Sequence, residues 1–405
     1  MQLYTSALES SVRQRQRKLR AMNLPTLTLN PQLEASIASG HPWVYHNHLP
    51  DHDLETGEWV RVQAGRAWSY GLFDKRSPIA LRLFGRDEPN SEMVAGRVMR
   101  ALELRANWFG KDTNAQRMIG GEGDFLPGVT VDRYERFAVL QTYADCLEVI
   151  VPDVVQALAK SGLGLKGIVR REDKQLEVLW GEMPPPELTI LENGLKIIAN
   201  LYEGQKTGLF LDHRDNRALI QRVARGKSVL NLFAYTGAFS LYAARGGATK
   251  VSSVDIAPAA MRDAERNFAL NGFEPGLHEF IAADCFTLLE EYVRDGKRFD
   301  LVILDPPSLA RSKDNRYAAA RAYKKLNTLA LRCVTDGGML ATASCTSQIG
   351  ADAFKEILLE AAGDAGKRVQ IVQENGQAVD HPVTFFEGRY LKFVLARVLE
   401  QPSAR

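Results

Sequence analysis

Acidic residues close three apolar segments in the second half of the chain. Asp255, Asp284 and Asp305 each stand at the end of a short aliphatic run. A single acidic residue there would commonly cap the following helix. Three in the same relation predict a shared binding site, because the strands of a parallel sheet bring their carboxyl ends to one edge. Carboxylates at such an edge are typical partners of ribose hydroxyls and of an adenine amino group, so we expect an adenosine-containing ligand.

The apolar run 229–233 leads into a turn with one glycine, Gly237, which lets the backbone approach a ligand before a helix begins. The second glycine of a pyrophosphate-binding turn is missing, and so is a Gly-Lys-Ser/Thr phosphate loop, so NAD and ATP fit poorly. S-adenosylmethionine has no phosphate to cradle and fits better. The residues expected to bind this cofactor are Asn231, Phe233, Tyr235, Thr236, Gly237, Asp255, Ile256, Asp284, Phe286 and Asp305.

A cysteine closes a further apolar run. Cys345 follows 339–344 and should lie at the same sheet edge as the carboxylates. A thiolate there could attack a substrate atom. An unpaired cysteine is more often a small buried side chain, and location alone leaves both interpretations of Cys345 open. We apply the structural interpretation to Cys146, Cys285 and Cys333.

The elements that must position these residues follow a Pro184-Pro185-Pro186 run, which is typical of a stiff linker. Apolar segments then alternate with amphipathic ones. This alternation predicts a Rossmann-like α/β domain over 188–405, with a doubly wound, mostly parallel sheet covered on both faces. The expected strands are 229–233, 250–255, 280–284, 299–305 and 338–344.

The first half of the chain has a different pattern. Short β-like runs broken by glycine and proline predict a small β-barrel domain over 25–102. Mixed strand and helix patterns predict a small α+β domain over 103–187. Residues 1–24 form a basic tail. The ordinary interpretation of such a tail is a solvated segment, and the alternative interpretation is an arm that binds RNA.

Composition narrows the class of protein. Lys and Arg outnumber Asp and Glu by only 51 to 49, so any nucleic-acid surface must be a local patch. The four cysteines lack zinc-site and disulfide-framework spacing, so we expect no metal. No segment approaches the roughly 18 apolar residues of a membrane span, and the N-terminus lacks the apolar core of a signal peptide. We therefore expect a cytoplasmic protein with no membrane partner.

Several short motifs occur in a specific order. They are Gly40-His41-Pro42-Trp43-Val44, Gly123-Asp124-Phe125-Leu126-Pro127-Gly128, Gly204-Gln205-Lys206-Thr207-Gly208-Leu209-Phe210-Leu211-Asp212, Asn231-Leu232-Phe233-Ala234-Tyr235-Thr236-Gly237, Leu304-Asp305-Pro306-Pro307, Ala343-Ser344-Cys345 and Asp380-His381-Pro382-Val383. From about residue 27 on, the chain resembles the bacterial large-subunit (23S) ribosomal RNA cytosine-5 methyltransferases, which have an N-terminal PUA domain. Residues 188–405 resemble the class I S-adenosylmethionine-dependent catalytic domain. The tail before residue 25 has no counterpart there.

The resemblance implies a covalent mechanism on RNA. Carbon 5 of cytosine is too weak a nucleophile to take a methyl group unaided, and attack of the Cys345 thiolate on carbon 6 would activate it. Asp305 is the second expected catalytic residue, and Pro306 and Pro307 stiffen the turn that meets the base edge. The PUA domain would add RNA contacts.

The resemblance further implies that Gln205, Lys206 and Thr207 help close the cofactor site. The residue after Pro307 is Ser308, where some RNA cytosine-5 enzymes carry a second cysteine, so the base that removes the carbon 5 proton stays open. Asp380 and His381 are candidates for this base, with a cap or structural hydrogen bond as the more ordinary interpretation.

The segment 309–325 is rich in cations and also carries tyrosines. Such a run is usually a solvated helix face. Next to the reaction centre it could also bind RNA phosphates. Together with the two prolines, its expected substrate-binding residues make the set Pro306, Pro307, Lys313, Arg316, Tyr323 and Lys324.

Two alternatives to a 23S ribosomal RNA 5-methylcytidine enzyme remain. A guanine-directed rRNA methyltransferase would share Asp-Pro-Pro but would need no thiol. A non-catalytic RNA-binding assembly factor could keep the methyltransferase fold, although the complete set of three aspartates and Cys345 disfavours it. The sequence leaves the target nucleotide and the oligomeric state open, a homodimer included.

Overall fold

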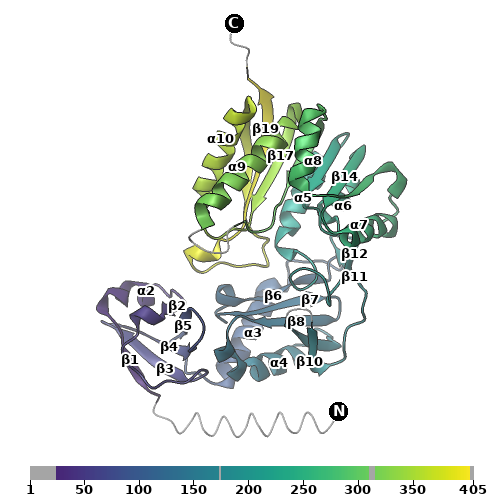
Figure 1. Ribbon diagram of the computed structural model, residues 1–405. Coiled ribbons are helices and arrows are strands. Elements are labelled where there is room, and N and C mark those ends of the chain that lie inside the picture. The colour runs from purple at the N-terminus through teal and green to yellow at the C-terminus, as the bar shows by residue number, and fades with distance from the viewer. Residues whose placement is uncertain (1–23, 173–174, 310–314, 402–405) are drawn as a thin grey trace. The chain divides into compact units, whose positions relative to one another are not determined.

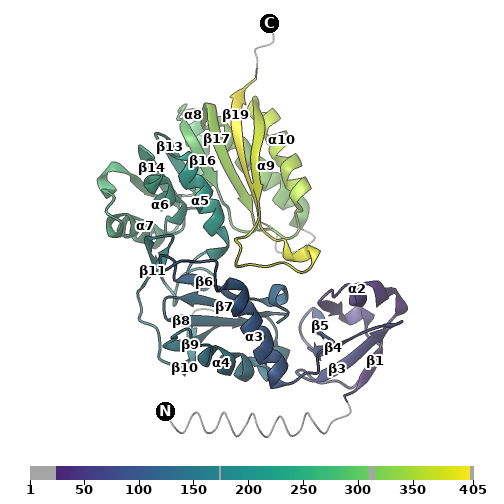
Figure 2. The same cartoon turned by 180° about the vertical axis from the view of Figure 1, so that it is seen from behind.

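The structure is a computed structural model that describes residues 24–172, 175–309 and 315–401. The chain forms two compact units, and each is built from separate stretches of sequence (Figures 1 and 2). Unit 1 contains the described residues up to Ile190, together with Ala199–Leu209 and Asp380–Gly388. Unit 2 contains Leu191–Ile198, Phe210–Val379 and the described residues from Arg389 on. The basic N-terminal tail and Lys313 lie outside the described residues.

Unit 1 begins with a five-stranded sheet in the order β1-β3-β4-β5-β2. Aliphatic residues of alternate positions in β3, among them Val60 and Val62, are fully buried in its core. The expectation of a small N-terminal β domain is confirmed, whereas its closure into a barrel and its bounds of 25–102 stay predictions. Its elements are β1 (Thr26–Thr28), η1 (Pro31–Leu33), α2 (Glu34–Ala38), β2 (Trp43–Tyr45), η2 (His46–His48), β3 (Trp59–Ala64), β4 (Ala67–Phe73) and β5 (Ile79–Gly85).

A second sheet of unit 1 has the order β10-β9-β8-β7-β6. Helix α3 packs against β6 and helix α4 against β10. The side chain of Asn90 starts α3 by accepting a hydrogen bond from the Met93 amide at 2.8 Å. These elements are α3 (Ser91–Arg105), β6 (Ala115–Gly120), η3 (Gly121–Asp124), β7 (Val129–Tyr134), β8 (Phe137–Thr142), η4 (Asp145–Val149), α4 (Val151–Ala159), β9 (Gly167–Glu172) and β10 (Gln175–Gly181). A two-stranded hairpin follows, formed by β11 (Leu188–Glu192) and β12 (Leu195–Ala199).

Unit 2 is built on a seven-stranded sheet in the order β15-β14-β13-β16-β17-β19-β18. The first five strands of this order are parallel, while β19 is antiparallel to both of its neighbours. This confirms the predicted mostly parallel sheet. The strands are β13 (Ser228–Leu232), β14 (Lys250–Asp255), β15 (Glu279–Ala282), β16 (Phe299–Leu304), β17 (Val334–Ser344), β18 (Lys367–Asn375) and β19 (Lys392–Glu400).

The order of the strands defines where a ligand should bind. The chain runs outward from β13 through β14 to β15 and then returns to place β16 on the other side of β13. The gap between the carboxyl ends of β13 and β16 is therefore a topological switch point, where open α/β sheets bind ligands. The helices of unit 2 are η5 (Leu211–His213), α5 (Arg214–Val223), α6 (Ala238–Arg245), α7 (Pro258–Leu270), η6 (Pro275–Leu277), α8 (Cys285–Arg294), α9 (Arg316–Arg332) and α10 (Ala351–Ala365), and η8 (Phe386–Gly388) belongs to unit 1.

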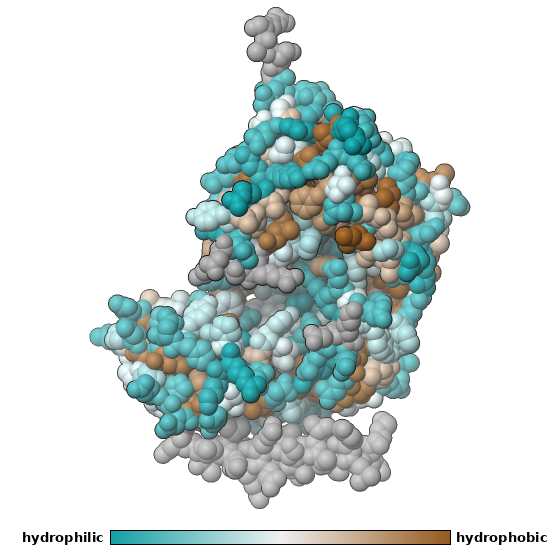
Figure 3. Space-filling model, in the orientation of Figure 1, coloured by the Kyte–Doolittle hydropathy of each residue, from teal (hydrophilic) through white to brown (hydrophobic). Residues whose placement is uncertain are grey.

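Surface hydropathy is mixed on both units. Figure 3 shows hydrophilic residues over most of this face, interrupted by small hydrophobic patches. Among the described residues, none of the helices is both long and apolar enough to cross a membrane.

Candidate active site

The carboxyl ends of β13, β14, β16 and β17 lie in register. Leu232 is paired with Val254 on one side and with Leu304 on the other, and Leu304 is paired with Thr342. The residues that follow these ends therefore meet at one edge of the sheet. They include the glycine turn after β13, Asp255 at the end of β14, Asp305 after β16 and Cys345 after β17.

The turn after β13 has an unusual backbone that Asp255 holds in place. Phe233, Tyr235 and Gly237 have positive φ angles of 58°, 47° and 77°. Asp255 accepts hydrogen bonds from the Tyr235 amide at 2.9 Å and the Ala257 amide at 3.0 Å. A Cβ atom on Gly237 would lie 2.9 Å from the Cβ of Ala264, so glycine is needed both for the φ angle and for contact with α7.

Two polar residues, Asn231 near the end of β13 and Thr236 in the turn after it, are buried but differ in their partners. The Asn231 amide donates to Ser240 Oγ at 2.9 Å, and Ser240 is bonded to Ser253 at 2.7 Å, so Asn231 ties β13 to α6 and β14. The Thr236 hydroxyl is also buried, yet it has no hydrogen-bond partner among the described residues. A buried hydroxyl without a partner is costly. The Asn231 side chain is thus committed to the fold, and the Thr236 hydroxyl stays an unsatisfied buried group beside the turn.

The rim of the edge combines apolar and acidic side chains. Ile256 is 70% exposed directly after Asp255, and Phe286 is half-buried. Asp284 is exposed and caps α8, because its carboxylate accepts from the Thr287 amide at 2.9 Å. This hydrogen bond lowers the pKa of Asp284. The helix-cap interpretation, which three aspartates together seemed to disfavour, applies to this one.

Asp305 lies next to a histidine that the sequence analysis missed. His213 Nε2 is 3.3 Å from Asp305 Oδ2. His213 Nδ1 is 3.1 Å from the amide nitrogen of Asn216, which is only a donor, so Nδ1 must accept and Nε2 carries the proton. Asn375 donates to the Asn216 carbonyl oxygen at 3.1 Å and so fixes the direction of that amide. This chain of hydrogen bonds aims an N–H group at Asp305.

Cys345 differs from the other three cysteines. Cys146, Cys285 and Cys333 are buried, and burial raises the pKa of the first two thiols to about 12 and that of Cys333 to about 11. Such thiols are inert near neutral pH, as predicted. Cys345 is half-buried at the sheet edge.

A hydroxyl cluster underlies the segment around Cys345. The Tyr323 hydroxyl is 2.9 Å from Thr346 Oγ1, and Ser308 Oγ is 3.2 Å from the same atom. Tyr323 is fully buried, and burial raises the pKa of its phenol. The expectation that Tyr323 contacts RNA is therefore corrected: α9 turns it into the core, where it supports Thr346 beside Cys345.

Comparisons with known proteins agree with this geometry. A family model described as S-adenosylmethionine-dependent methyltransferase matches residues 128–382. The chain belongs to the S-adenosylmethionine-dependent methyltransferases. A PUA-like domain model matches residues 27–86 of the methyltransferase.

Relatives extend the match over nearly the whole chain. The methyltransferase is 37% identical to "Ribosomal RNA large subunit methyltransferase I" of Shewanella denitrificans over 92% of its own length and 99% of the relative. It is also 37% identical to "Ribosomal RNA large subunit methyltransferase" of Deinococcus radiodurans, over 92% and 97%. A solved structure of a candidate SAM-dependent methyltransferase from Streptococcus mutans has a TM-score of 0.83 at 24% identity, covering 92% of this chain and all of the other, and shows the shared fold.

The loop expected to help close the cofactor site belongs to unit 1. Gln205 and Lys206 are exposed, and Lys206 has a positive φ of 51°. Thr207 is buried, where its hydroxyl donates to Asp132 at 2.6 Å and lies 2.7 Å from the Tyr134 hydroxyl. The Thr207 side chain of the methyltransferase is thus used within unit 1, and the two residues before it are the ones left on its surface.

The basic segment after Asp305 is only partly as expected. Pro306 is buried and Pro307 exposed, consistent with a stiff turn at the rim. Arg316 is exposed at the start of α9. Lys324 is paired with Glu360 at 3.2 Å and Asp364 at 3.1 Å, and these hydrogen bonds raise its pKa. Two carboxylates offset its charge, so Lys324 is a weaker candidate for an RNA phosphate than Arg316.

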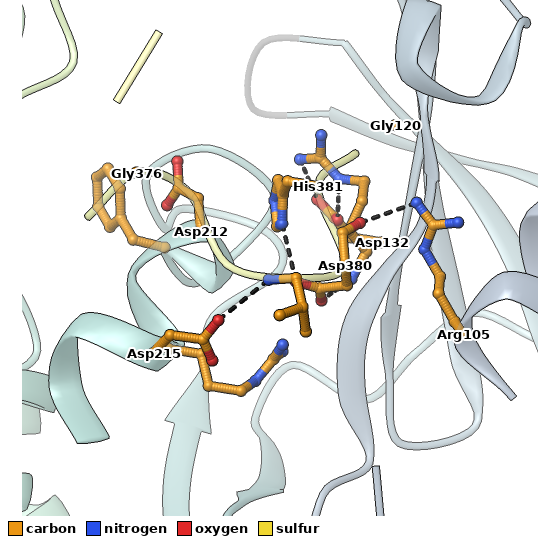
Figure 4. A network of polar contacts seen from close by, with 12 residues as sticks. Arg105, Gly120, Asp132, Asp212, Asp215, Gly376, Asp380 and His381 are labelled. Atoms are coloured by element: carbon orange, nitrogen blue, oxygen red, sulfur yellow. Dashed lines mark hydrogen bonds and ion pairs between the residues drawn. The ribbon is translucent and has the colours of Figure 1, made fainter. Parts of the chain in front are cut away.

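Asp380 and His381 have structural partners within unit 1 (Figure 4). Asp380 accepts from the Arg117 amide at 2.9 Å, lies 2.9 Å from His381 Nδ1, and its carbonyl accepts from Arg105 at 2.8 Å. A Cβ on Gly123 would lie 2.0 Å from the Pro382 carbonyl oxygen. These contacts support the structural interpretation of the Asp-His-Pro motif. No group of side chains in the described part of the chain could hold a metal ion.

Proposed function

We propose that this protein is a cytoplasmic S-adenosylmethionine-dependent methyltransferase that forms 5-methylcytidine in large-subunit (23S) ribosomal RNA, with Cys345 as the nucleophile. The observation that carries the proposal is the half-buried Cys345 after β17, one strand from Asp305 after β16. The names of the two relatives supply the substrate class.

The residues at the sheet edge fit the cofactor. Asp255 holds the turn with two backbone hydrogen bonds, and a carboxylate can accept further bonds from ribose hydroxyls. Ile256 offers an exposed apolar surface for a flat adenine ring. When bound, S-adenosylmethionine supplies an electrophilic methyl group.

Cys345 and Asp305 have separate roles in the reaction on the cytosine base. The Cys345 thiolate forms a bond to carbon 6, and the electron pair of the 5,6 double bond shifts so that carbon 5 becomes nucleophilic. Asp305, aimed by His213, would orient the amino edge of the cytosine. After methyl transfer a base removes the carbon 5 proton, and the electrons of that bond expel the thiolate.

Replacing Asp255 with alanine is expected to weaken S-adenosylmethionine binding roughly 10- to 100-fold, the usual value of a lost charged hydrogen bond. Calorimetric titration of the purified protein measures this. Asp263→Ala is a matched control, because it removes a half-buried carboxylate from α7, where Asp263 contacts Arg266. Equal affinity in Asp255→Ala and wild type would show that this carboxylate does not contact the cofactor.

Product analysis tests the proposed function directly. Ribosomal RNA from cells that lack the gene is incubated with the purified protein and methyl-labelled S-adenosylmethionine, digested to nucleosides and analysed by mass spectrometry. We expect the label in 5-methylcytidine from 23S RNA. Label in a methylated guanosine would identify a guanine-directed enzyme instead, and failure to bind the cofactor would indicate a non-catalytic factor.

A further inference from the structure

A buried lysine lies opposite the segment that carries Cys345. Strand β19 runs antiparallel to β17, with Lys392 directly across from Ser344. The Lys392 ammonium donates to the carbonyl of Thr346 at 2.6 Å and to that of Tyr390 at 2.8 Å. Cys345 lies between Ser344 and Thr346, so Lys392 contacts the backbone on both sides of the cysteine.

Lys392 has no carboxylate partner to balance its charge. It is 6% exposed and forms no ion pair with any other residue that the structure describes. Lys367 on β18 is equally buried, but it is paired with Glu400. Burial without an anion is costly for an ammonium group. Burial accordingly lowers the pKa of Lys392 to about 8, while the charge of Cys345 acts in the opposite direction.

We propose that Lys392 is a positioning residue that holds Cys345 as a thiolate. The Cys345 thiol releases its proton to solvent, and the Lys392 ammonium, which keeps its hydrogen bonds to the two carbonyls, balances the charge of the thiolate; no other bond changes. The Cys345 thiolate then supplies the negative charge that the buried Lys392 ammonium otherwise lacks. Its meaning for catalysis rests on the proposed function, but the pair itself does not need RNA or cofactor.

Two further titratable neighbours of Cys345 within the described residues, Tyr323 and Asp305, carry no positive charge. Tyr323 from α9 interacts with both Cys345 and Asp305, and burial raises its pKa, so its phenol is neutral near pH 7. Asp305 is acidic, and His213 points its Nε2 at that carboxylate. A negative carboxylate nearby disfavours a second anion, which makes the Lys392 charge more important.

The test is the pH dependence of Cys345 alkylation by iodoacetamide in the full chain, followed by mass spectrometry of the Cys345 peptide. In the wild type we expect the half-maximal rate below the ordinary thiol pKa of about 8.5. In Lys392→Met we expect the midpoint to rise by about one pH unit or more, with a roughly tenfold slower rate at pH 7. Lys367→Met, which removes an equally buried lysine from β18, should leave the profile unchanged.

Two results would overturn the proposal. One is a wild-type midpoint at about 8.5 or above, which decides the matter even if Lys392→Met does not fold. The other is an unchanged profile in folded Lys392→Met. Failure of the proposed function looks different: if Cys345→Ser still methylates RNA while alkylation depends on Lys392, the pair exists but the cysteine is not the nucleophile.

Discussion

Replacing Cys345 with serine is expected to reduce formation of 5-methylcytidine by roughly 10³-fold or more, because a hydroxyl is too weakly acidic to form the bond to carbon 6 at neutral pH. The rate is measured on unmodified 23S RNA by nucleoside mass spectrometry. Calorimetric affinity for S-adenosylmethionine should stay within about twofold of wild type, since the exchange of sulfur for oxygen changes little else in the fold.

A buried cysteine provides the matched control for this experiment. Cys146 is fully buried in unit 1, and burial raises the pKa of its thiol to about 12. Cys146→Ala should therefore keep the wild-type rate. If Cys345→Ser were as active as Cys146→Ala, a covalent cytosine mechanism would be ruled out.

Replacing Glu192 with alanine is expected to destabilise the protein by about 3–5 kcal/mol, the cost of leaving buried cations without their anion. Glu192 is fully buried and receives two hydrogen bonds from Arg217, at 2.8 and 2.6 Å, and Arg214 lies 3.4 Å away. Both arginines are buried as well. Urea unfolding monitored by circular dichroism measures the loss. Glu172→Ala is the control, since that side chain is 74% exposed and should cost less than about 0.5 kcal/mol.

The buried ion pairs of Glu192 with Arg217 and Arg214 also predict that the stability of the protein depends on pH. Burial alone would raise the pKa of Glu192, but the guanidinium groups of Arg217 and Arg214 outweigh it and hold the pKa below the ordinary 4.5. A depressed folded-state pKa stabilises the protein above the unfolded value, and this contribution is lost as the pH falls through the folded pKa. The difference between wild type and Glu192→Ala should therefore be full at pH 7 and shrink well below pH 4.5. A constant difference over this range would contradict the assignment.

The parallel core of unit 2 could be predicted from the sequence because its strands are buried on both faces and therefore read as short apolar runs. The predicted 250–255 matches β14, and the predicted 229–233 is displaced by one residue from β13. Strand β18 was missed because its residues alternate between exposed and half-buried, a pattern that a polar segment shares. The PUA-like sheet could be predicted because glycine and proline residues separate its short strands.

The candidate site could be predicted only where local sequence carries the signal. Asp255, Asp305 and Cys345 follow strands directly, so their shared edge could be inferred. Lys392 and His213 could not be found in this way, because they reach the site through strand pairing and through hydrogen bonds between distant segments. Asp284 shows the reverse problem, since a strand end and a helix cap have the same local sequence.

The discontinuous makeup of unit 1 has a consequence for how the chain acquires its structure during synthesis. Its buried Arg105 donates to the backbone of Asp380, 275 positions further on. The hydrogen bond between Arg105 and the Asp380 carbonyl can therefore form only after almost the entire polypeptide has been synthesised. Proteolytic cleavage between residues 210 and 379, or expression of a fragment that stops at the proline run, should therefore yield an N-terminal piece lacking part of its own interior. We expect such fragments to be poorly soluble and to fold only when the missing C-terminal peptide is supplied.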